Sequence, residues 1–122
     1  MSVEYSTDLY YGCQIDEYYN TILDIAENFP DINTITKEEF ESLFDDYIFY
    51  LNSWSAEGVF LGTRVKTECE YNNAVMKLYD YIEAKNLYEK EPNEEFENFV
   101  KILRELIPDL PPLTFCIVNQ LH

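Results

Sequence analysis

The chain has 122 residues, of which 47% are hydrophobic and 16% aromatic; this is enough to bury one core and excludes a wholly disordered chain. Its 24 acidic and 8 basic residues give a net charge of −16, and no basic patch is present, which excludes direct binding to DNA, RNA or an anionic membrane. We therefore expect a single domain over residues 1–122 that binds basic proteins.

The first predicted element is a strand over residues 9–15, where aromatic and apolar side chains surround Gly12. Helices over residues 17–29 and 37–52 follow, because apolar side chains recur there at helical spacing. The second helix begins at a capping box formed by Thr36 and Glu39. The apolar positions of the two helices are Tyr18, Ile22, Ile25, Phe29, Phe40, Phe44, Tyr47 and Leu51.

The same order of elements is predicted again in the second half of the chain. A strand over residues 59–65 precedes helices over residues 70–82 and 93–107, and Pro108 ends the second of these. A last strand covers residues 113–118. Segments rich in Pro, Asn and Gly predict loops, over residues 30–35, 53–58 and 86–92.

Matching landmarks in the two halves predict an internal duplication, with repeats over residues 8–52 and 58–107. Gly12 and Gly62 each follow two large apolar residues, and the helices over residues 17–29 and 70–82 share one apolar spacing. A helical hairpin returns the chain to the end of the sheet that it left. The sequence therefore predicts an α+β fold of order β-αα-β-αα-β, in which four helices pack on a three-stranded antiparallel sheet.

The residue types that carry most enzymatic chemistry are scarce. The one histidine is His122, and the three glycines are too far apart to form a phosphate-binding loop. Cys13, Cys69 and Cys116 form no CxxC motif and are expected to be reduced core thiols. No run approaches the roughly 18 to 20 apolar residues of a membrane span. We expect a cytoplasmic protein that is not an enzyme and has no metal or cofactor.

The acidic residues are unevenly distributed. Residues 1–63 contain 13 acidic residues and one basic residue, Lys37, a balance of −12, whereas residues 64–122 have a balance of −4. Carboxylates three or four residues apart on a helix stand about 5 to 6 Å apart at Cβ, so that two acidic helices approximate a row of phosphates. The predicted partner-binding residues are Asp16, Glu17, Asp24, Glu27, Asp31, Glu38, Glu41, Asp45 and Asp46, with Tyr19 and Tyr50 as aromatic anchors.

In size, charge and lack of catalytic groups, the chain resembles the small acidic inhibitors that phages deploy against bacterial nucleases, including anti-CRISPR proteins and DNA mimics. This resemblance implies an inhibitor that occupies the basic nucleic-acid-binding surface of its partner. It rests on no family motif, so it assigns no residue roles. Two alternatives remain open: an immunity protein that neutralises a basic toxin, and a metal-binding domain or enzyme built on the carboxylates.

Overall fold

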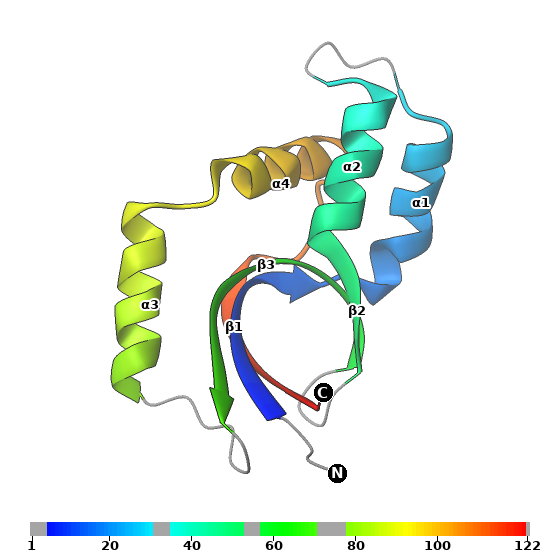
Figure 1. Cartoon of the computed structure of the whole chain (residues 1–122). Helices are drawn as coiled ribbons and strands as arrows, with labels where there is room; N and C mark the ends of the chain where they lie inside the picture. The colour runs from blue at the N-terminus through cyan, green and yellow to red at the C-terminus, as the bar shows by residue number, and fades with distance from the viewer. Residues whose placement is uncertain (1–4, 31–34, 53–56, 71–77, 122) are drawn as a thin grey trace.

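A computed structural model of the chain (Figure 1) describes residues 5–30, 35–52, 57–70 and 78–121. Its elements in chain order are β1 (Tyr5–Gln14), the short 3-10 helix η1 (Asp16–Tyr18), α1 (Tyr19–Glu27), α2 (Lys37–Tyr47), β2 (Ile48–Asn52), β3 (Glu57–Glu70), α3 (Leu78–Lys90), α4 (Glu94–Leu106) and β4 (Thr114–Leu121). The described residues thus confirm the predicted α+β class and its four α-helices.

The sheet has four strands and not the three predicted, in the order β2-β3-β1-β4, and every neighbouring pair is antiparallel. The additional strand is β2, whose residues were predicted to form the end of the helix over 37–52. Their apolar spacing fits either structure, but Ile48 and the aromatic residues after it favour extended backbone. The chain accordingly passes from helix to strand at Ile48, where φ is −116° and ψ is 123°.

Two predicted helices begin later than expected. The segment 17–29 forms the last two residues of η1 and then α1, which ends at Glu27. The helix predicted over 70–82 is wrong at its start, because Glu70 lies in β3 and α3 begins at Leu78; residues 71–77 are outside the described part. The loop predicted over 86–92 is also wrong for the most part, since α3 continues to Lys90.

The two halves of the chain nevertheless share one topology, because β1-α1-α2-β2 and β3-α3-α4-β4 have the same order of strands and helices. Exchanging the halves reverses the strand order β2-β3-β1-β4 and leaves the sheet unchanged. Gly12 and Gly62 lie directly opposite each other in the central strand pair. This symmetry agrees with the predicted correspondence of the two glycines. The predicted correspondence of 17–29 and 70–82 fails at Glu70, which belongs to β3, and over 71–77 it lies outside the described residues.

The central strands lie very close together at the glycine pair. A Cβ atom on Gly12 would overlap the carbonyl oxygen of Leu61 and lie 2.6 Å from the Cα atom of Gly62. Figure 1 shows that the sheet curls strongly and that the helices lie outside the curl. Because glycine has no side chain, two glycines at facing positions permit such a bend, as they do in other curved sheets.

The main core lies between the convex side of the sheet and the helices. It is rich in aromatic side chains: Phe40 of α2 and Phe99 of α4 are fully buried, and their ring centroids are 5.6 Å apart. A smaller cluster of buried residues, Tyr10, Leu51 and Val118, packs with Phe49 and Phe60. The helices therefore depend on the convex core for their positions on the sheet.

We predict that Gly12→Ala destabilises the protein by about 1 to 3 kcal/mol, because the new methyl group must displace backbone atoms of the neighbouring strand. Gly62→Ala is the matched control, since its Cβ would lie 3.3 Å from the Tyr11 carbonyl oxygen and 3.6 Å from the Gly12 Cα atom. Denaturant unfolding of the two variants measures the difference. Equal losses would show that the contact at Gly12 does not limit the sheet.

Candidate partner-binding surface

Helices α1 and α2 lie side by side (Figure 1), and most of their acidic side chains are exposed. Each is amphipathic: Ile22 of α1 and Phe40 of α2 are fully buried. The predicted capping box fixes the start of α2, because the Thr36 hydroxyl accepts a hydrogen bond from the Glu39 backbone N–H at 3.2 Å, and the Glu39 carboxylate accepts one from the Thr36 N–H at 3.4 Å. The sequence signal for this helix start is confirmed.

A groove of about 310 Å³ lies between the two helices, and three of the predicted acids line it: Glu27, Glu41 and Asp45. Lys37 also lines the groove, where its ammonium donates to the Glu27 carbonyl oxygen at 3.3 Å and lies 3.9 Å from the Glu41 carboxylate. The one base of residues 1–63 therefore joins α1 to α2. It leaves most of the surrounding carboxylates unneutralised.

The remaining predicted acids on η1 and the helices are also exposed: Glu17, Asp24, Glu38 and Asp46. The Asp24 carboxylate accepts a hydrogen bond from the Asn28 side-chain amide at 3.0 Å, which stabilises the end of α1. Asp31 lies outside the described residues. The acids of α1 and α2 thus form one negative surface, which we call the α1–α2 acidic surface.

The two tyrosines predicted as anchors differ. Tyr19 is half-buried, and its ring lies 6.1 Å from that of Phe44, so it joins α1 to α2. Tyr50 on β2 is 61% exposed and donates a hydrogen bond to the Glu57 carboxylate at 3.0 Å. This hydrogen bond is the largest cause of the raised pKa of Tyr50. Tyr50 is therefore the more accessible of the two.

Asp16 carries a negative charge and also has a structural role as a hydrogen-bond acceptor. Its carboxylate accepts hydrogen bonds from the Val59 backbone N–H at 3.0 Å and from the Gln14 side-chain amide. It also occupies the space beside Gly58, whose φ of +133° favours glycine. The hydrogen bond from Val59, followed by that from Gln14, lowers the pKa of Asp16. Asp16 thus ties the end of β1 to the start of β3.

The prediction missed the acids at the start of α4, which extend the α1–α2 acidic surface. The Tyr47 hydroxyl, at the end of α2, donates to the Glu95 carboxylate at 2.8 Å. Burial raises the pKa of Tyr47, and the negative charges of Glu95 and Asp46 raise it further, although a hydrogen bond with Asn93 opposes them. The run Glu94–Glu95 is visible in the sequence, but its position beside α2 comes from tertiary packing.

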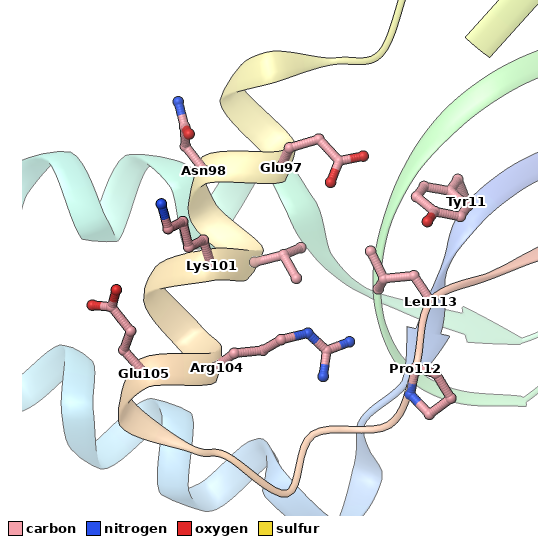
Figure 2. A pocket seen from close by; sticks show the side chains of 9 residues that line it. Tyr11, Glu97, Asn98, Lys101, Arg104, Glu105, Pro112 and Leu113 are labelled. Atoms are coloured by element: carbon pink, nitrogen blue, oxygen red, sulfur yellow. The ribbon is translucent and has the colours of Figure 1, made fainter. Parts of the chain in front are cut away.

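A second hollow, of about 720 Å³, lies between α4 and the segment before β4 (Figure 2). Arg104 extends into it and donates hydrogen bonds to the carbonyl oxygens of Leu110 at 2.9 Å and Pro111 at 2.8 Å. Glu97 of the same helix points toward Tyr11. Arg104 therefore fixes the chain that leads into β4, and none of the predicted site residues lines this hollow.

The structure places two of the three cysteines. Cys13 is buried and Cys116 half-buried, and both thiols are free; the side chain of Cys69 is not described. Burial raises the pKa of Cys13 to about 11, which disfavours the reactive thiolate. Among the described residues, no three His, Cys, Asp or Glu side chains are grouped to hold a metal ion, and no helix there is long and apolar enough to cross a membrane.

We predict that Asp16→Asn lowers stability at neutral pH, because the amide keeps the shape of the acceptor but loses its charge. A depressed carboxyl pKa stabilises the folded state above the unfolded pKa, close to 3.8, and this contribution is lost as the pH falls through the lower folded value. The stability difference between wild type and variant should therefore shrink on acidification. Thermal unfolding from pH 7 to pH 2 tests this, and a difference independent of pH would contradict it.

Comparison of the chain with protein-family models, with curated proteins and with solved structures finds no match. Functional inference therefore rests on the geometry and charge of the chain itself. The feature that stands out is an acidic surface built on α1 and α2, extended by the start of α4, in which one lysine faces many carboxylates.

Proposed function

We propose that the chain is an inhibitor that uses its α1–α2 acidic surface to occupy the basic nucleic-acid-binding surface of a nuclease-type partner. The observation that carries the proposal is the concentration of exposed carboxylates on two adjacent helices of a chain with net charge −16. A surface of this kind attracts a cationic groove and repels nucleic acid.

The arrangement of the carboxylates supports binding as well as solubility. Like charges on one helix face destabilise the helix by about 0.2 to 0.5 kcal/mol per pair. Asp45 and Asp46 also lie in the last turn of α2, where the helix dipole disfavours negative charge. Lys37 is the only base among the first 63 residues to offset these costs. A binding role gives a reason for keeping the acids where they reduce stability.

The groove offers a partner more than charge. Its lining combines the acids Glu27, Glu41 and Asp45 with apolar residues that include Leu23 and Phe44. A lysine or arginine side chain has an apolar stem and a charged head, so it matches this combination. We infer that basic side chains of the partner enter the groove and that the surrounding acids steer the approach.

We predict that reversing the groove acids, with Glu27→Lys, Glu41→Lys and Asp45→Lys combined, slows association with the partner about tenfold or more at low salt. A partner captured from cell lysate provides the probe, and surface plasmon resonance measures the rates. Raised salt should weaken binding of the wild type, and excess duplex DNA should compete with it for the same surface.

The matched control reverses Glu89, Glu91 and Glu105 to lysine, which changes the net charge equally at exposed positions outside the α1–α2 acidic surface. Equal losses from the two triple variants would show that bulk charge governs binding. Simultaneous binding of the chain and duplex DNA would contradict occupation of the nucleic-acid surface. Thermal unfolding of each variant separates lost binding from lost folding.

A further inference from the structure

The exposed apolar side chains lie mainly on α3 and β4. Among the described residues, six large hydrophobic side chains are exposed, and one of them, Tyr50, is on β2. The other five are Leu78, Tyr79, Ile82, Leu87 and Ile117. Four of these five side chains belong to α3 and one, Ile117, to β4, and exposed apolar side chains are frequent at interaction surfaces.

Strand β4 is an edge of the sheet and carries no charge. Within the described ranges it pairs with β1 alone, since the strand order there ends at β4. Residues 111–121 include no Asp, Glu, Lys or Arg, in a chain of which 26% of residues are charged. Natural proteins usually protect a free edge with charges, prolines or bulges, because its unpaired N–H and C=O groups attract another strand. An uncharged edge of eight residues is therefore suited to strand pairing.

Contacts with its neighbours hold this edge in place. Arg104 fixes the segment that enters β4, and the Phe115 ring packs 5.9 Å from that of Tyr88 on α3. Ile117 lies two residues further along the same face of the strand and is 45% exposed. The edge is thus a preformed surface with an apolar side chain near its centre.

We propose that β4 is a self-association edge, at which two copies of the chain pair their β4 strands antiparallel about a two-fold axis near Ile117. The pairing joins two four-stranded sheets into one of eight strands. A two-fold interface of this kind uses the same patch on both copies and closes on itself. Because β4 contains no charged residue, no like charges face each other across the seam.

The charges of α3 are complementary in this arrangement. The first half of the helix carries Asp80 and Glu83, and the second half carries Lys85, Glu89 and Lys90. Lys85 lies 5.7 Å from the centre of the Phe115 ring, near the start of β4, and Figure 1 shows α3 running opposite to β3. Antiparallel pairing puts the two α3 helices on one face, with the lysine end of each at the level of the acidic end of the other.

The net charge of the chain determines how salt affects the proposed dimer. Each copy carries a net charge of −16, so the two copies repel each other at long range. Helix α2, which carries part of the α1–α2 acidic surface, runs directly into β2, and β2 is the edge of the sheet opposite to β4. Salt screens this repulsion and should strengthen the dimer, whereas it should weaken binding of a basic partner. The two proposals therefore respond to salt in opposite directions and fail independently.

The experiment is sedimentation equilibrium of the purified full chain at 50 and 500 mM NaCl. We expect a monomer–dimer equilibrium whose dissociation constant falls at least about tenfold at the higher salt, and Ile117→Lys should raise it at least about tenfold by placing a charge on the edge. The matched control is Tyr50→Lys. Tyr50 on β2 takes the place of Ile117 on β4 when the two halves of the chain are exchanged. This variant should leave the dissociation constant of the dimer unchanged.

Hydrogen exchange provides a readout that needs no variant. Amides of β4 should become protected as protein concentration rises, while those of β2 should not. A monomer at every concentration and salt would overturn the proposal, and so would a dimer that Tyr50→Lys weakens as much as Ile117→Lys does. A dimer disrupted by Tyr79→Lys but not by Ile117→Lys would assign self-association to α3 alone and also overturn the pairing of β4.

Discussion

The close approach of β1 and β3 at Gly12 and Gly62 is the constraint on which the arrangement of this protein depends. Because neither position has a side chain, the two strands can lie this close, and the sheet curls with the helices on its convex side (Figure 1). A second, smaller cluster of buried residues packs separately from the core under the helices. Packing against the convex side fixes α1 and α2, so the position of their carboxylates depends on two residues that have no functional group.

Stability and charge come from different parts of the chain. An aromatic core that includes Phe40, Phe96 and Phe99 lies under the helices, while the described outer faces carry many acids and few pairs between opposite charges. Surface ion pairs contribute about 0 to 1 kcal/mol each, so their scarcity costs little compared with burial of a phenylalanine. The core therefore supplies the stability of a chain whose surface charge contributes little to it.

Local signals in the sequence predicted local structure well. The Thr36–Glu39 capping box and Pro108 fixed one end each of α2 and α4 correctly. Strand β2 was missed because its apolar residues continue the helical spacing of α2. Strand β3 was predicted only over residues 59–65, although the alternation of Arg64, Lys66, Glu68 and Glu70 with less polar residues continues to its end at Glu70. The proximity of Glu95 to Tyr47 was not predictable, since residues 48 positions apart in sequence meet only through packing.

The pairing of Tyr5 with Leu121 brings the two ends of the described chain together. A tether attached at either end therefore leaves the molecule from one place, at the far end of the sheet from α1 and α2 (Figure 1). Immobilised through an end, the molecule presents its acidic helices to the solution. The same attachment crowds the last residues of β4, so a bulky fusion at the C-terminus acts as a steric block on that edge.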